Sequence, residues 1–352
     1  MQLLKHIDKA LIDYLEYYNM EKYYENQILS FENACRLIKE LKSQKYVIDH
    51  NEYMYKLFPE NNGSTINLEE GECAVAYCKS AFNYFIENDD DFEKAMNTKK
   101  HHPITGAYRI GVFSKDEDIL IDIDDVVPFY DRIWCITRSA GVLYEKFKMI
   151  GNTSQERALK IYPPCMPFPS EPMIGFVGTE PKKESYSSGR GNSHGGNLDL
   201  PCIKKGSKVI LPSVNNHPGV WFGDIHAKQG WGEIAGTALE CSGMVKFRMY
   251  KVQLFKKAQE PIVIVPKPDN NGYEIYFVGC RNTFTNALSA AVKNAVKFYP
   301  IWNTYGFIDA YRELGFSGNV YVGQARGKTI SIAIKIEIED INTLFINGKG
   351  VF

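Results

Sequence analysis

Apolar residues recur every three to four positions in the first hundred residues of the chain, a spacing typical of amphipathic helices. The pattern predicts helices over residues 3–18, from Ser30 to about residue 41, and from about Leu68 to Ile86. Helices of this length are unstable alone in water, so we expect them to pack on the rest of the chain or on a second subunit. Residues 1–100 are therefore predicted to form a helical amino-terminal extension.

Beyond His102 the pattern changes to short runs of β-branched and apolar residues separated by turns, which is typical of strands. We expect strands over residues 109–113, 119–123, 133–137, 172–177, 207–211, 219–226, 234–240, 245–254, 262–265, 273–278, 319–322 and 329–338. Helices are expected over residues 285–298 and 308–314. Residues 101–352 are thus predicted to form one α+β domain, with a β-rich, mostly antiparallel core like a sandwich or barrel and helices near its carboxyl end.

The charge balance narrows the classes of partner. The chain has 41 basic and 42 acidic residues, so it lacks the sequence-wide basic field that nucleic-acid binding needs. No apolar run approaches the ~20 residues that cross a bilayer. Lys5, Asp8 and Lys9 stand where a signal peptide needs an apolar stretch. We expect a soluble, cytoplasmic protein with neither nucleic acid nor membrane as a partner.

The cysteines suggest neither a structural zinc site nor a redox motif. The chain has 8 of them, scattered, and none forms a Cys-x-x-Cys pair. We interpret them as buried thiols.

A glycine- and serine-rich loop over residues 180–200 ends in the cluster His194-Gly-Gly-Asn197-Leu-Asp199. Long loops inside compact domains are often functional. Paired glycines let the backbone turn sharply, so the three polar side chains can converge on one centre. The alternative is an Asx-turn that only closes the loop, and the sequence leaves both interpretations open.

A second polar cluster interrupts an apolar strand. Residues two apart on a strand point to one face, so Asp224 and His226 lie side by side. An imidazole beside a carboxylate is half of a zinc site, and catalytic zinc commonly takes three protein ligands plus a water. Glu233 follows a Gly-Trp-Gly turn that can fold it back toward the pocket as a general base. The alternative is a salt-bridged Asp–His pair at a strand end.

Four motifs occur in a fixed order along the chain: Pro172–Gly178, His194–Asp199, Leu211–Val214 and Gly223–Glu233. In order and spacing they resemble the signature of the acetamidase/formamidase family. The resemblance covers about residues 103–345 and does not extend to the first hundred residues. It implies a β-rich α+β fold, hydrolysis of short amides such as formamide or acetamide to acid and ammonia, and a metal-dependent pocket.

The resemblance also implies three sets of site residues and the partners of the site. The catalytic set is Glu233, Asp224 and His226; the metal-ligand set is His194, Asp199, Asp224 and His226; the substrate-binding set is Asn197 and Gln229, to which we add Trp231 on the strength of its own position in the motif. We expect a divalent metal in the site, namely zinc, and consider calcium as a second ion with a structural role. The expected partner is a small amide, and the expected assembly is a homo-oligomer, a dimer.

Trp231 departs from the family pattern, because the family typically has an acidic residue between these two glycines. The indole either stacks on a bulkier amide or is an ordinary core or lid residue. A further departure is the insertion of Gly191, Asn192 and Ser193 before His194. Two alternative functions therefore stay open: amide chemistry on a lactam or larger metabolite, and non-catalytic binding of a small molecule on the same fold.

Overall fold

The computed structural model describes residues 47–48, 56–57, 65–81, 102–136, 141–143, 158–161, 170–183, 185–299 and 306–346. The helices predicted over residues 3–18 and 30–41 lie outside these ranges.

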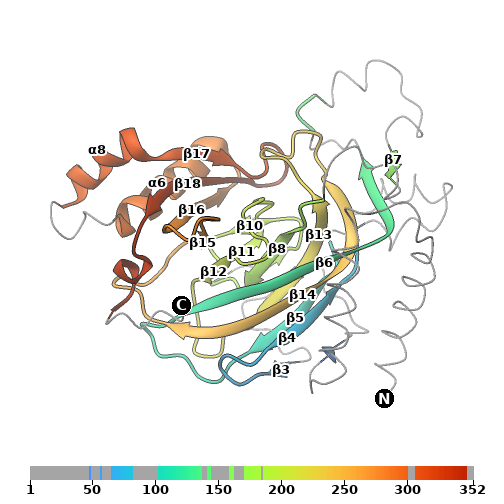
Figure 1. Ribbon diagram of the computed structural model, residues 1–352, viewed down its shortest axis with the longest axis horizontal. Helices are drawn as coiled ribbons and strands as arrows, with labels where there is room; N and C mark the ends of the chain where they lie inside the picture. The colour runs from blue at the N-terminus through green and yellow to red at the C-terminus, as the bar shows by residue number, and fades with distance from the viewer. Residues whose placement is uncertain are drawn as a thin grey trace.

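One sheet of 16 strands forms the framework of the described residues (Figure 1). Neighbouring strands on its central path are antiparallel. In spatial order the path is β10 (Gly191–Asn192), β11 (Gly195–Asn197), β8 (Met173–Thr179), β13 (Val220–Lys228), β14 (Leu239–Val252), β6 (Asp118–Ile136), β12 (Lys208–Leu211), β15 (Ile262–Pro266), β16 (Tyr273–Arg281), β18 (Ile330–Ile338) and β17 (Asn319–Val322).

Shorter strands flank this path. They are β1 (Val47–Ile48), β3 (Ile66–Asn67), β4 (Ala74–Cys78), β5 (Ile104–Arg109) and β7 (Ala158–Ile161), and β2 (Lys56–Leu57) pairs with β9 (Tyr186–Ser187) in a separate sheet. β4 pairs with β14, and β5 pairs with β13. Strands from before residue 100 are therefore part of the main sheet.

The helix predicted from Leu68 to Ile86 is wrong over residues 68–81. The segment Ala74–Cys78 is strand β4, held between β1 and β14. Four of its five side chains are buried, so the apolar run has no visible period of two. A short apolar run of this kind is compatible with either a helix or a buried strand, and only its pairing partners decide between them.

Two predicted strands are also wrong. The strand expected over residues 109–113 ends at Arg109, because Gly111 has φ +55° and opens a turn. The strand expected over residues 234–240 is a turn until Leu239, where β14 begins. Conversely, the strands expected over residues 119–123 and 133–137 are one long strand, β6.

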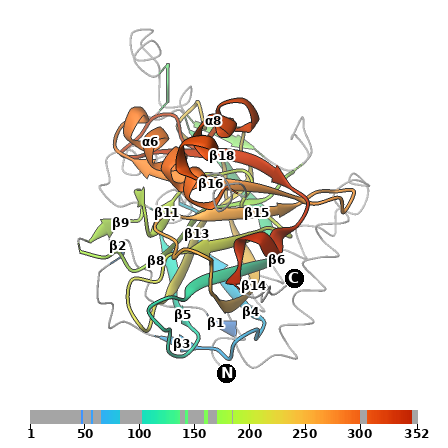
Figure 2. The same ribbon diagram turned by 90° about the vertical axis from the view of Figure 1, so that its left-hand side faces the viewer.

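The sheet curls around a first apolar core and carries a second core on its outer face. Along β16, Tyr276, Val278 and Cys280 point into the first core, whereas Ile275 and Phe277 point into the second. Helices α6 (Phe284–Phe298) and α8 (Phe307–Ser317) cover the second core, as Figure 2 shows. A 3-10 helix, η3 (Ile341–Leu344), follows β18.

The fold class expected from the sequence is confirmed: the protein is a β-rich, mostly antiparallel α+β half-barrel, and both carboxyl-terminal helices are present. Among the described residues, no helix is both long and apolar enough to span a membrane.

Candidate active site

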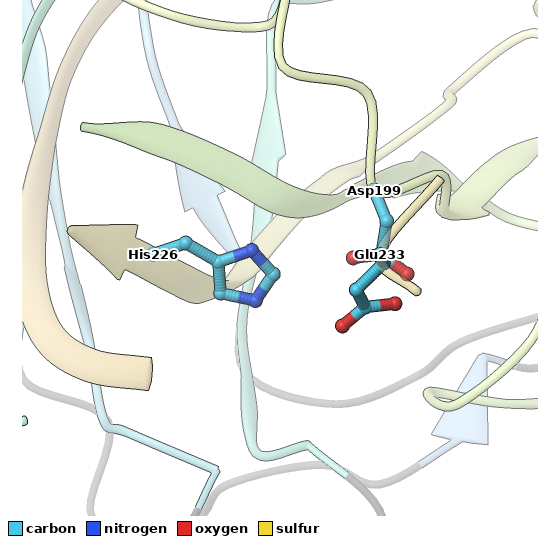
Figure 3. Close-up of side chains that lie close together, drawn as sticks. All are labelled: Asp199, His226 and Glu233. Carbon is cyan, nitrogen blue, oxygen red and sulfur yellow. The ribbon is translucent and has the colours of Figure 1, made fainter. Parts of the chain in front are cut away.

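Buried acidic and imidazole side chains converge where β11, β13, β14 and the segment after β17 meet. Figure 3 shows Asp199 and Glu233 beside each other, facing the imidazole of His226 on β13. One potential ligand atom from each of these three residues lies within 4.8 Å of the other two. Asp224, His226 and Glu240 form a second such group. The structure thus brings the two sequence clusters together on a shared histidine.

Three of the acids sit on left-handed backbone. Their φ values are +48° for Asp199, +57° for Asp224 and +41° for Glu233. Among the described non-glycine residues, only Asn270 also has positive φ. Such conformations are sparsely populated and persist where surrounding structure enforces them, which occurs often at functional sites. The strained backbone therefore indicates that the fold holds these three carboxylates in defined positions, as a functional site requires.

Gly175 on β8 lies directly against the carboxylates of Asp199 and Asp224. A Cβ at this position would lie 2.7 Å from Oδ1 of Asp199 and 2.8 Å from Oδ2 of Asp224. The Gly175 carbonyl also accepts hydrogen bonds from the backbone N–H groups of Leu198 (3.0 Å) and Asp199 (3.1 Å). Only a residue without a side chain leaves room for both carboxylates at this point.

The imidazole of His226 is buried and has a fixed orientation. Gln229 donates its side-chain N–H groups to the carbonyls of Asp199 (2.6 Å) and Gly323 (3.3 Å), so its Oε1 faces Nδ1 of His226 at 2.8 Å. An amide oxygen only accepts, so Nδ1 carries the hydrogen. The other nitrogen, Nε2, is left to face Asp224 Oδ1 at 3.3 Å and Glu240 Oε2 at 3.2 Å.

Several of the converging atoms have unused lone pairs. Asp199 Oδ1, Asp224 Oδ1, His226 Nε2 and Glu240 Oε2 are buried and lack a hydrogen bond of normal geometry to a described residue, although His102 Nδ1 lies 2.9 Å from Asp224 Oδ1. The contacts around His226 are within ion-pair distance but lack hydrogen-bond geometry. Buried polar atoms normally have hydrogen-bond partners. Carboxylate oxygens and an imidazole nitrogen that lack such partners and lie close together are typical ligands of a metal cation.

Side-chain amides hold one carboxylate oxygen each of Asp199 and Glu233. Gln324 donates from Nε2 to Asp199 Oδ2 (3.1 Å) and to Glu233 Oε2 (3.0 Å). Asn197 donates from Nδ2 to the same Asp199 oxygen at 2.7 Å. These bonds fix the two carboxylates while leaving Asp199 Oδ1 directed into the site.

The electrostatics of Asp199 and Glu233 favour bound protons. Burial raises the pKa of Asp199 well above its usual range, and the neighbouring carboxylates of Glu233 and Asp224 raise it further. Burial likewise raises the pKa of Glu233, to about 7, against the opposing effect of His226. A carboxyl group with this pKa can exchange a proton near neutral pH.

Asp224 and His226 are shifted toward their charged forms. Burial alone would raise the pKa of Asp224, but His102 and His226 outweigh it and hold that pKa well below its usual range. Burial would lower the pKa of His226, but Glu240 and Asp224 raise it well above its usual value. Without a bound cation, the negative charge of Asp224 is therefore balanced by protonated His226, and a cation that binds at Nε2 would displace that proton.

His194, expected as a metal ligand, lies outside both groups of potential ligands. Its ring packs against Tyr186 with centroids 4.8 Å apart. Burial, followed by the charge of Arg281, lowers its pKa to about 3, so the imidazole is neutral.

Trp231 is 36% exposed. It stacks on Tyr276 at a centroid distance of 5.9 Å and contacts Tyr321 at 4.7 Å.

Three site residues were missed by sequence reasoning: His102, Glu240 and Gln324. His102 places Nδ1 2.9 Å from Asp224 Oδ1. Glu240 is the direct cross-strand partner of His226 in the β13–β14 ladder. Only the strand pairing with His226 identifies Glu240, and only side-chain contacts between segments distant in the sequence identify His102 and Gln324.

Sequence comparisons with known proteins find similarity to acetamidases and formamidases. The model of the acetamidase/formamidase family matches residues 187–311. A formamidase of Methylophilus methylotrophus is 30% identical over 121 residues, which are 32% of this chain and 30% of that protein. A predicted formamidase of Schizosaccharomyces pombe is 23% identical over 268 residues, covering 57% of this chain and 65% of that protein. The chain thus matches less than two thirds of the length of these curated relatives.

Solved structures extend the likeness at the level of the fold. An acetamidase from Bacillus halodurans superposes with a TM-score of 0.71 and 22% sequence identity. The superposition covers 84% of this chain and 98% of that one.

Proposed function

We propose that this chain is a member of the acetamidase/formamidase family, whose model matches residues 187–311, and that it hydrolyses the carbon–nitrogen bond of a carboxamide. In this reaction, water adds to the amide carbonyl, the C–N bond breaks, and the products are a carboxylic acid and ammonia or an amine. The observation that carries the proposal is the convergence of Asp199, His226 and Glu233, within 4.8 Å, with lone pairs unused around them.

A divalent cation fits this donor set, and zinc is the metal we propose. Asp199, Asp224, His226 and Glu240 would hold it, since an imidazole combined with carboxylates is a common zinc ligand set. Carboxylate oxygens also suit calcium, which we keep as a candidate for a second, structural ion beside zinc. When bound, the cation supplies a Lewis acid that polarises the carbonyl and the attacking water.

Glu233 supplies the proton transfers. Its carboxylate accepts the proton of the attacking water and passes it to the departing nitrogen. Its pKa of about 7 matches this double role, and Gln324 keeps the carboxylate aimed at the site. Gln229 fixes the imidazole of His226, so the site is preorganised before substrate arrives.

An ammonia-release assay over a series of carboxamides, with the zinc-loaded protein, tests the proposal. Glu233→Gln keeps the shape of the side chain but removes its basicity, so we expect turnover to fall by at least about a hundredfold. Glu339→Gln on the exposed surface is the matched control and should retain full activity.

Activity that survives in the Glu233→Gln protein would refute the assigned role of Glu233. A zinc-loaded native protein that releases ammonia from no carboxamide would refute hydrolysis and favour the non-catalytic binding alternative. Elemental analysis and size-exclusion chromatography of the same preparation test the proposed cation and the proposed homodimer.

A further inference from the structure

Exposed apolar side chains flank the buried acid Glu233. Trp231 is 36% exposed and Ile234 is 69% exposed, whereas Glu233 between them is only 7% exposed. Val142 (47%) and Leu143 (52%) belong to a second segment. The Val142 backbone N–H donates to the Ile234 carbonyl at 2.8 Å, which joins the two segments. We call Val142, Leu143, Trp231 and Ile234 the apolar rim.

The indole of Trp231 is held on a rigid support. Tyr276 and Tyr321 pack against each other edge-on at 5.8 Å, and both contact the indole. Tyr276 stands on β16 and Tyr321 on β17, on either side of β18. The hydroxyl of Tyr276 donates to Glu274 at 2.7 Å. Trp231 is thus ordered by its inner contacts while more than a third of its surface stays open.

The indole and the buried acid share one anchored turn. The Gly232 N–H donates to the Val322 carbonyl at 2.5 Å, and the Ala325 N–H donates to the Gly232 carbonyl at 2.9 Å. Gln324, one of the two residues between Val322 and Ala325, donates from its side chain to Glu233 at 3.0 Å. These two backbone bonds, together with the side-chain bond from Gln324, therefore fix the position of the indole relative to the Glu233 carboxylate.

Ligand sites combine a few buried polar groups with apolar walls. Exposed apolar side chains gathered in one patch also mark binding surfaces in soluble proteins. Formamide and acetamide have almost no apolar surface to cover such a rim. A substrate with an aryl or extended apolar acyl group would place its amide at the acids and its hydrocarbon body on the rim.

We propose that the apolar rim, with Trp231 as its stacking platform, selects carboxamides with an aromatic or extended apolar acyl group. This inference rests on the proposed function, because it assigns the acids to the amide. Trp231 is a specificity-determining residue in this scheme, and it takes no part in proton transfer.

The test compares kcat/KM for ammonia release from phenylacetamide and from acetamide. The native protein should prefer phenylacetamide. Trp231→Ala should lower the phenylacetamide-to-acetamide ratio by about tenfold to hundredfold, mainly through KM, since a stacked and buried ring contributes that much to affinity. Trp231→Phe should restore part of the ratio. Phe316→Ala, on an 80% exposed aromatic of α8, is the control and should leave the ratio unchanged.

A ratio that is the same in the Trp231→Ala and native proteins overturns the inference, as does an equal effect of Phe316→Ala. If the native protein releases ammonia from neither amide, the proposed function fails and calorimetric titration with phenylacetamide decides the inference separately. Binding that weakens at least tenfold in Trp231→Ala supports the platform; no binding to the native protein overturns it.

Discussion

Replacing Gly175 with alanine tests the site geometry without removing any polar group. The new Cβ would lie 2.7 Å from Asp199 Oδ1 and 2.8 Å from Asp224 Oδ2, whereas ordinary contact begins at 3.4 Å. Each oxygen must therefore move by about 0.6 to 0.7 Å (from 2.8 or 2.7 Å to 3.4 Å). The Asp224 carbonyl, 2.9 Å away, is backbone and gives less easily.

Displacements of this size have a large effect on chemistry and a smaller one on stability. A misplacement near 1 Å can cost about a hundredfold in rate, so we expect a loss of about tenfold to hundredfold in kcat/KM. Overpacking costs about 1 to 3 kcal/mol of unfolding free energy, partly offset by about 0.4 to 1 kcal/mol from the lower entropy of the unfolded chain.

Gly230→Ala is the matched control, because its Cβ would meet nothing within 4 Å. Neither Gly175 nor Gly230 is among the glycines with positive φ, so alanine is free of backbone strain at both positions. Ammonia release and thermal unfolding of the two variants separate the steric effect from the common entropic one. A folded Gly175→Ala protein with native activity and native metal content would refute the assigned geometry.

Two further predictions concern the cation. Removing the cation with a chelator leaves buried carboxylates facing one another without a counter-ion. If the ion was present at about a hundred times its Kd, its removal should lower the free energy of unfolding by about 3 kcal/mol. Thermal unfolding with and without added zinc measures this loss. A midpoint that chelation leaves unchanged would contradict a bound cation. Glu240→Gln should weaken zinc affinity by at least about tenfold. The fold should be preserved, because the amide oxygen can still accept from the Ala238 N–H. Metal titration measures the affinity, with Glu339→Gln as the reference, and an affinity equal to that of the reference would show that Glu240 is not a ligand.

Local pattern determined much of the fold. β8, β12, β13, β15, β16, β17 and β18 and both carboxyl-terminal helices lie close to the positions predicted from alternation and helical period. These segments alternate or run apolar between clear turn residues, so their type depends little on distant partners. The segment Ala74–Cys78 was mispredicted because β1 and β14 pair with both of its edges and four of its five side chains are buried, so its apolar run shows no period of two.

The sequence by itself determined which residues form the two polar clusters and that Asp224 and His226 share a face, because a period of two is a local property of a strand. Only the tertiary structure decided that Glu240 joins them, since that depends on the register that pairs it with His226. The same holds for Gln324, which reaches Asp199 and Glu233 from 125 and 91 residues away in the chain. Contacts between distant segments depend on how the sheet curls and pairs, and no local pattern of apolar and polar residues encodes that.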